Sequence, residues 1–396
     1  SALFDFIIII ILNMQDRKFS VSPFETMSNS KADDEPPKKY TRPQPSLSSL
    51  PDDIVLRCLV RVPRSYHLNI SWVSKDLRSL VRSPEFNVLR STLPKSSLHV
   101  CLEEDDDDDN SSFHWFTLNE TSTTEYGLVP NPTLFPPHPK YGSSTVSVGS
   151  KIFFIGGSIE PSTDLWILDT RTGSITRGPS MSVPRRQRYA AVEVIDGKIY
   201  VLGGEPYIDG RLFHQVEVFD PKSKTWEVTE EEDVRKISNC SATVEEKVYM
   251  VDYEKTSVYD PREGEGGERL VQMDKLNDMA HSVCVVEDVL FAFFNKTGLM
   301  WFDTKLDVWR RLVGRDGKEL MFILDAGAMA EYEGRLVVLY MGDEDIFDVP
   351  VTQSVRCMFV SLDRAGGKIC GTIDWSGTVA TVPFMFRFLH CLAVSG

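Results

Sequence analysis

The sequence lacks the short patterns that mark most enzymes and metal-binding proteins. Its 396 residues contain no G-x-S-x-G nucleophile elbow, no P-loop and no H-E-x-x-H zinc motif. The seven histidines are scattered, and none of them forms a pair at metal-ligand spacing. We therefore expect no catalytic residue, no metal site and no cofactor, and we expect the chain to act by binding other molecules.

Cysteine pairs are also missing. The seven cysteines are an odd number, they are widely spaced, and no two form a C-x-x-C pair. This usage favours a reducing compartment, the cytoplasm or the nucleus, in which each thiol acts as a small buried hydrophobic group.

Long hydrophobic runs are absent where a membrane protein would need them. The run Phe6–Leu12 has only seven apolar residues, while a helix that spans a bilayer needs about 20. No basic region and no small-residue cleavage site accompany this run, so we do not read it as a signal peptide. We expect residues 1–45 to be a disordered leader, with Met14 or Met27 as the natural start, and no membrane partner.

Positive charge is scarce in the larger part of the chain. Residues 96–396 carry 29 Lys and Arg against 48 Asp and Glu, so phosphate backbones would be repelled and nucleic acid is excluded as a partner. Residues 30–95 carry the opposite excess, 12 against 7. The run Asp105–Asp109 lacks the spacing of a calcium loop, and we interpret it as a solvated loop.

A repeated strand pattern fills the middle of the chain. Two copies end in glycine pairs, at Gly156 and Gly157 and at Gly203 and Gly204, so the period is 47 residues. In the second copy, Asp196-Gly197 between two β-branched runs predicts a tight hairpin. A period of this length indicates four-stranded sheets packed around an axis, because one such sheet cannot bury both of its faces alone.

Later positions of each copy carry further signals. A third strand ends in aspartate in four copies, at Asp169, Asp220, Asp260 and Asp303, and a turn follows each. Trp226 and Trp309 begin the outermost strand of two copies. This combination of glycine pair, aspartate turn and tryptophan resembles the kelch repeat, which implies a mainly β, kelch-type β-propeller.

Units begin near residues 141, 187, 240, 281 and 326, which makes five. The segments Leu98–Leu102 and Phe113–Leu118 together with Phe386–Val394 would form a sixth blade from both ends of the chain. We expect six blades within residues 96–396, with five or seven as alternatives.

The pattern of residues 46–90 predicts a small all-α domain. Pro51 and the two aspartates after it suit a helix start, and apolar residues follow at helical spacing until Pro63. A second stripe runs from Ile70 to Leu80 and ends at Pro84. Leu50-Pro51, the hydrophobic helix and Val73-Ser74-Lys75 resemble the F-box, and the order of domains is similar to plant F-box/kelch-repeat proteins.

This resemblance implies the substrate receptor of an SCF-type cullin–RING ubiquitin ligase, in which the F-box binds the Skp adaptor and the propeller binds the protein to be ubiquitylated. The implied adaptor contacts are Leu50, Pro51, Ile54, Leu56, Leu59, Val62, Pro63, Val73, Ser74 and Leu77. Alternatively, about half of the apolar members pack the interior of the domain.

Loops at one end of a propeller surround its axis, and the substrate is expected there. The candidate contacts near this mouth are Arg185, Arg186, Arg188, Tyr207, His214 and His281. Such basic residues on an acidic propeller favour an acidic peptide or an anionic ligand. Alternatively, the arginines form a solvated turn. A kelch scaffold outside any ligase and a propeller enzyme remain the alternative functions.

Overall fold

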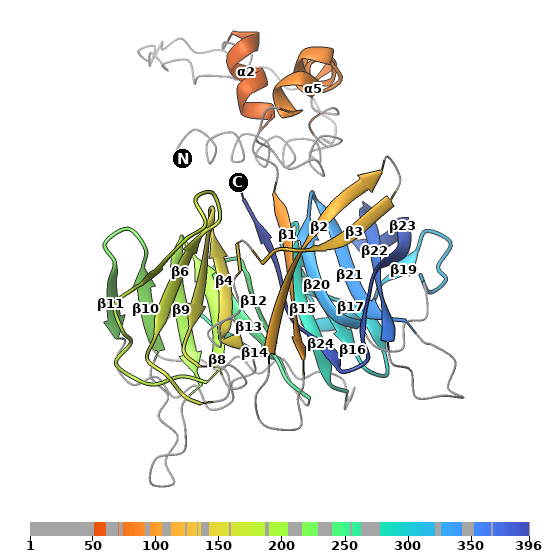
Figure 1. The fold of residues 1–396 in the computed structure, drawn as a ribbon. Coiled ribbons are helices and arrows are strands. Elements are labelled where there is room, and N and C mark those ends of the chain that lie inside the picture. The colour runs from red at the N-terminus through yellow and green to blue at the C-terminus, as the bar shows by residue number, and fades with distance from the viewer. Residues whose placement is uncertain are drawn as a thin grey trace, which may run out of the picture. The chain divides into compact units, whose positions relative to one another are not determined.

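The chain forms two compact units, Ser1–Leu93 and Pro94–Gly396, which we treat separately. The computed structural model describes residues 51–60, 70, 74–91, 96–104, 112–122, 125–132, 134–135, 142–157, 160–186, 190–204, 216–228, 240–253, 256–262, 278–320, 326–342, 352–365 and 367–395. Figure 1 shows the helices of the first unit and the sheets of the second.

The first unit, called the helical unit below, contains helices α2 (Asp52–Leu59), α4 (Lys75–Val81) and α5 (Pro84–Ser91). Two acidic residues occupy the first turn of α2, where the helix dipole favours them. Ser74 caps α4, because its Oγ accepts the N–H of Leu77 at 3.1 Å.

The sequence predicted that Pro84 ends the second helical stripe, and α4 indeed stops before it. It did not predict that Pro84 also begins α5. The N–H of Phe86 donates to Ser83 Oγ at 3.1 Å, and Phe86 is buried in the unit's core. Proline suits this first helical position, since its missing N–H would have no partner there.

The second unit is a six-bladed β-propeller, as the sequence predicted. Blade 1 contains β4 (Ser144–Val148), β5 (Lys151–Ile155), β6 (Leu165–Asp169) and β7 (Ser174–Arg177). Blade 2 contains β8 (Ala190–Ile195), β9 (Lys198–Gly203), β10 (Val216–Asp220) and β11 (Thr225–Val228). Blade 3 contains β12 (Ser241–Val244), β13 (Lys247–Val251) and β14 (Thr256–Tyr259).

The remaining blades have longer strands. Blade 4 contains β15 (Ala280–Val286), β16 (Val289–Phe294), β17 (Gly298–Asp303) and β18 (Val308–Arg311). Blade 5 contains β20 (Ala326–Tyr332), β21 (Arg335–Met341), β22 (Thr352–Ala365) and β23 (Lys368–Pro383), with β19 (Val313–Gly314) parallel to β23 at its edge. Blade 6 contains β24 (Phe386–Val394), β1 (Ser97–Glu104), β2 (Ser112–Ser122) and β3 (Glu125–Pro130).

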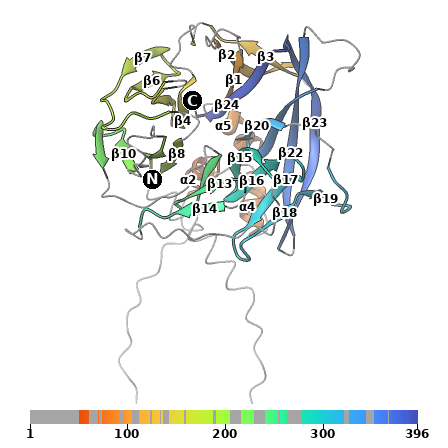
Figure 2. The ribbon, with the colours of Figure 1, turned by 90° about the horizontal axis from the view of Figure 1, so that it is seen from below.

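Both ends of the propeller unit meet in blade 6. The last strand, β24, is its innermost strand and pairs antiparallel with β1, from Ser97 opposite Val394 to Glu104 opposite Phe386. The six innermost strands follow each other around the axis in the order β24, β4, β8, β12, β15 and β20, and β20 in turn contacts β24 (Figure 2). The ring is therefore closed by strand pairing.

One face of the propeller carries short turns, namely those between the two inner strands of blades 1 to 5 and those between the third and fourth strands of blades 1, 2 and 4. In blades 2 to 5 the turns between the two inner strands have two central residues, and both have positive φ, as in Asp196-Gly197 and Glu333-Gly334. Such type I′ turns match the twist of the strands that they join. We call this the short-turn face, and the chain enters the propeller on it because β1 begins there.

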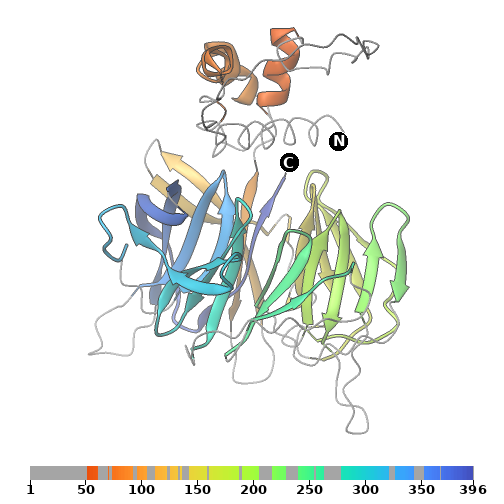
Figure 3. The same cartoon turned by 180° about the vertical axis from the view of Figure 1, so that it is seen from behind.

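The opposite face carries the connections between blades and those between the second and third strands. Several of them are long, such as 204–215 and 342–351. We call this the long-loop face. The blades run between the two faces, as the green and teal sheets show in Figure 3.

The glycine pairs lie where the chain passes close to a neighbouring segment. Gly156 and Gly204 have φ of 76° and 81°, a region that side chains disfavour. A Cβ on Gly156 would lie 2.7 Å from the carbonyl oxygen of Arg185, and a Cβ on Gly157 would lie 1.7 Å from that of Glu160. Gly203 also has positive φ, at 64°.

The four repeated aspartates form the same local contact. Each accepts a hydrogen bond at Oδ1 from the backbone N–H two residues later, from Arg171, Lys222, Arg262 and Lys305 respectively. This Asx turn mimics a backbone turn and explains why aspartate ends the third strand.

The two tryptophans connect successive blades. Trp226 Nε1 donates to the carbonyl of Pro179, which follows blade 1, at 2.8 Å. Trp309 Nε1 donates to Thr256 Oγ1 of blade 3 at 3.0 Å. Their rings also pack on Phe219 and Phe302 of their own blades. Each indole therefore combines hydrophobic contact with one directed hydrogen bond to the preceding blade.

Arg185 differs from its expected position. Its side chain is fully buried, and Nη2 forms an ion pair with the buried Glu217 at 3.0 Å, while Nη1 donates to the carbonyl of Gly203. Ser182 donates its N–H and its Oγ–H to the other Glu217 oxygen, each at 2.7 Å. The prediction that Arg185 faces a substrate is therefore wrong, and so is the solvated-turn alternative, because burial leaves no surface for either role.

We predict that Glu217→Ala destabilises the propeller unit by about 3–5 kcal/mol, because it leaves the buried Arg185 charge without its partner. Thermal and urea unfolding measure this loss. Glu227→Ala is the matched control, since the Lys198–Glu227 pair is exposed and should contribute about 0–1 kcal/mol. Equal losses in both variants would contradict the assigned role of the Arg185–Glu217 pair.

Candidate functional site

A cavity of about 1150 Å³ lies along the axis of the propeller, between the innermost strands. All six blades contribute to its wall. Small and hydroxyl residues predominate among the contributions of blades 1, 3 and 5, with Ser144, Ser241 and Gly327 as examples. The cavity is therefore polar and wide enough to admit a side chain or a small ligand.

Three basic residues line the cavity near the long-loop face. Arg186 lies in the connection before β8, and His281 and Arg387 are the second residues of β15 and β24. They come from blades 2, 4 and 6, so they alternate with the small residues of the other three blades. We call Arg186, His281 and Arg387 the axial basic residues. Glu103, the strand partner of Arg387, lines the same cavity.

The structure places two of the predicted substrate contacts at this cavity, Arg186 and His281. Arg188, Tyr207 and His214 lie outside the described residues. Sequence reasoning missed Arg387, because it placed the strand Phe386–Val394 in the sixth blade but did not identify this strand as the innermost one of that blade. The closure by β24 brings this arginine to the axis.

Deeper in the cavity, Glu193 joins blades 2 and 3. Its carboxylate accepts hydrogen bonds from Ser241 Oγ at 2.7 Å and Thr243 Oγ1 at 3.1 Å. Burial raises the pKa of Glu193 to about 7, although these two hydrogen bonds oppose the rise. Burial also raises the pKa of Glu331, which lies near the C-terminal end of β20 and lines the same cavity.

His390 of β24 also lines the cavity, and its ring stacks on Trp115. Burial lowers its pKa to about 4. The imidazole is therefore neutral at physiological pH, and it adds no positive charge to those of Arg186 and Arg387.

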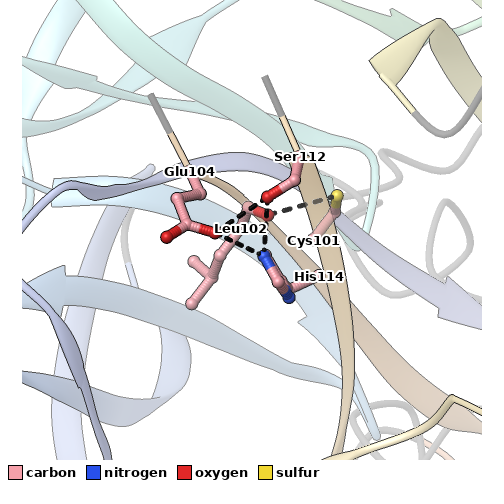
Figure 4. Close-up of polar contacts among 5 residues, drawn as sticks. All are labelled: Cys101, Leu102, Glu104, Ser112 and His114. Carbon is pink, nitrogen blue, oxygen red and sulfur yellow. Dashed lines mark hydrogen bonds and ion pairs between the residues drawn. The ribbon is translucent and has the colours of Figure 1, made fainter. Parts of the chain in front are cut away.

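One cluster in blade 6 contains the residue types of a hydrolase triad. Ser112 Oγ, His114 Nε2 and Glu104 Oε2 lie 2.8 to 3.0 Å from one another (Figure 4). A triad needs the serine and the carboxylate on different ring nitrogens, so that the histidine can pass a proton between them. Here both contact Nε2, so the cluster lacks the geometry of a catalytic triad. The hydrogen bond from Ser112 is the largest of the contributions that lower the pKa of Glu104.

Among the described residues, no group of three or more His, Cys, Asp or Glu side chains is arranged to hold a metal ion. Within this same part of the chain, no helix has the length and apolar character that crossing a bilayer requires.

In the helical unit, the predicted adaptor contacts divide into buried and exposed residues. Leu56 and Leu59 are buried in the unit's own core with Val55, so the prediction that these two leucines contact a partner is wrong, and they serve the interior instead. Pro51 and Ile54 are exposed, Ile54 by 37%.

Two further predicted contacts are partly buried. Leu77 packs against the core of the unit, and the hydroxyl of Ser74 is used for the cap of α4. Leu50, Val62, Pro63 and Val73 lie outside the described residues.

Similarity to known proteins covers both units. A model of the kelch-repeats domain FKB95 matches residues 114–380, and a model of the F-box domain matches residues 47–89. The putative F-box/kelch-repeat protein At2g41360 of Arabidopsis thaliana is 41% identical over 372 residues, 88% of this chain and 97% of the relative. The F-box/kelch-repeat protein At2g44630 of the same plant is 35% identical over 390 residues, 93% of this chain and 100% of the relative.

The raised pKa of Glu193 predicts a pH-dependent stability. The unfolded chain releases this proton near pH 4.5 and the folded chain near 7, so the folded state binds more protons in between. Stability conferred by this group therefore falls as pH rises from about 4.5 to about 7, by about 3 kcal/mol at most.

Urea unfolding of the wild type and of Glu193→Gln at several pH values measures this effect. We expect the variant to gain stability relative to the wild type across this window and the gain to stop above it. A stability difference that stays constant with pH would contradict the assignment.

Proposed function

Because the chain belongs to the F-box/kelch-repeat family, we propose that it is the substrate-recognition subunit of an SCF-type ubiquitin ligase. The F-box implies binding to a Skp-type adaptor, and the kelch propeller implies binding to a substrate. We further propose that the chain delivers a bound client to a cullin–RING ligase for ubiquitin transfer. The observation that supports it best is that models of both domains match this chain, the F-box before the kelch repeats, and that F-box/kelch-repeat proteins align with it over most of its length.

The exposed side of α2 is the proposed adaptor surface. The helix buries Val55, Leu56 and Leu59 on one side and leaves Pro51 and Ile54 accessible to a partner. A helical unit this small has little core, so further apolar burial against a partner would stabilise it. Since the adaptor side chains would cover Ile54, this residue is the most informative position for a test.

The long-loop face of the propeller is the proposed client surface. Its connections are long enough to vary in sequence without disturbing the blades, and the axial basic residues open onto it.

We propose that the chain itself catalyses no reaction and needs no cofactor. The transfer chemistry would belong to the other subunits of the ligase. The absence of catalysis by this chain is supported by the cluster in blade 6, where Ser112 and Glu104 both contact the same nitrogen of His114. All seven cysteines are free thiols, which supports action in a reducing compartment, the cytoplasm or the nucleus. A kelch scaffold outside any ligase would leave the exposed side of α2 without a partner.

We predict that Ile54→Glu weakens binding of the full chain to a recombinant Skp adaptor at least tenfold, because it places a charge in a contact that excludes water. The variant should fold, since position 54 is exposed and a carboxylate suits the first turn of a helix. Calorimetry measures the affinity.

The control for this test is Leu306→Glu, which makes the same change at a propeller side chain that is 60% exposed. It should bind the adaptor like the wild type. If neither the wild type nor Leu306→Glu binds any adaptor, the ligase proposal fails.

A further inference from the structure

Three large apolar side chains are about half exposed at the long-loop face. Met279 directly precedes β15, and Phe384 and Met385 form the turn between β23 and β24. We call these three residues the apolar rim. Each side of the rim lies close in sequence to an axial basic residue, since Met279 is two residues before His281 and Met385 is two residues before Arg387.

Buried polar side chains hold both parts of the rim in place. Asp278 is buried, and its carboxylate accepts the N–H groups of Lys296 and Thr297 and the hydroxyl of Thr297, at 2.7 to 3.0 Å. This contact fixes the backbone next to Met279 to the 295–297 turn of blade 4. Asp278 therefore anchors the backbone next to the exposed Met279.

Gln353 has the same function at the other part of the rim. It is buried at the start of β22, and its Nε2 donates to the carbonyl oxygens of Phe384 and Phe386 at 2.9 and 2.8 Å. The exposed Phe384 and Met385 are thus displayed on a turn that is tied to the sheet beneath it. Ordering the backbone of this turn before binding reduces the entropy cost of association.

The two parts of the rim are separated by one inner strand, β20 of blade 5. Packed sheets lie about 10 Å apart, so the step from blade 4 to blade 6 is about 20 Å. An extended chain covers about 3.3–3.6 Å per residue, and about six residues would bridge this distance. A segment that follows this path passes beside the cavity at the level of His281 and Arg387.

We propose that the long-loop face binds an extended client segment of about six residues that carries bulky apolar side chains around a central Asp or Glu. The apolar side chains pack on Met279 and on Phe384 and Met385, and the carboxylate enters the cavity mouth toward Arg387 and Arg186. Arg186 and Arg387 carry fixed positive charges at the mouth, where Glu103 carries a negative one. Glu193 and Glu331 line the same cavity, and burial raises the pKa of both carboxyls, which reduces their negative charge and favours an acidic group of the client at the mouth. This inference rests on the proposed role of the propeller as a client receptor.

A random 12-residue peptide library, displayed on phage and selected on the immobilised full chain, tests this proposal. We expect the selected peptides to combine an acidic residue with Leu, Phe, Trp or Met within about six positions. Fluorescence anisotropy then gives the affinity of one synthetic peptide, of its Glu→Gln or Asp→Asn form and of a form with its apolar residues changed to Ser.

Variants of the chain assign each part of the peptide to its contact. Arg387→Gln should weaken the parent peptide at least tenfold and remove its preference over the amide form, while the preference for apolar residues remains. The double variant Phe384→Ser, Met385→Ser should weaken the parent peptide and remove the preference for apolar residues, while the preference for the carboxylate over the amide form remains. Leu306→Ser, an exposed apolar change on the short-turn face, should leave all three affinities unchanged.

Two results would overturn the inference. One is a selection that yields no peptide or only peptides without this composition, and the other is a peptide whose affinity is insensitive to both rim and arginine variants. Adaptor binding is measured separately on the same variants and should stay intact. If the chain binds the adaptor but selects no such peptide, the inference fails and the proposed function stands. If the chain selects the peptide but does not bind the adaptor, the proposed ligase role fails.

Discussion

The pairing of β1 with β24 is the contact on which the propeller depends. Without it, blade 6 would lack its innermost strand, and the cavity would open between β20 and β4. The three strands from the start of the unit would then expose an edge capable of pairing with other chains. Because closure uses residues almost 300 positions apart, it couples the two ends of the propeller unit. It also brings Arg387, one of the axial basic residues, to the cavity.

The parts of the fold that follow from short-range chemistry were predictable from the sequence. Glycine pairs mark close backbone approaches, Asp196-Gly197 marks a type I′ turn, and the repeated aspartates mark Asx turns. Each of these signals depends on a few neighbouring residues, so it survives in a single sequence. The sixth blade was predicted on a different ground, since strands at the two ends of the unit would leave open sheet edges unless they paired. The family comparisons agree with both recognised domains.

Other features that depend on long-range packing were not predictable. The apolar and polar pattern around Arg185 is the same for an exposed and a buried side chain, and only the distant Glu217 decides between them. The strands β3 and β19 and the long β22–β23 hairpin carry no repeat signal. Helical spacing likewise identified Leu56 and Leu59 as apolar, but it does not say whether the neighbour is the unit's own core or another protein.

The two units offer different surfaces, since the helical unit exposes Ile54 on α2 and the propeller has a polar mouth with an apolar rim. We propose that the same chain holds an adaptor and a client together. The most direct test uses a ligase reconstituted from the full chain, adaptor, cullin and RING subunits. It measures ubiquitin transfer to a reporter protein that is fused to a peptide selected on the full chain. We expect a modified reporter and loss of modification when the peptide is scrambled. A reporter that binds the assembled ligase and is never modified would contradict this proposal.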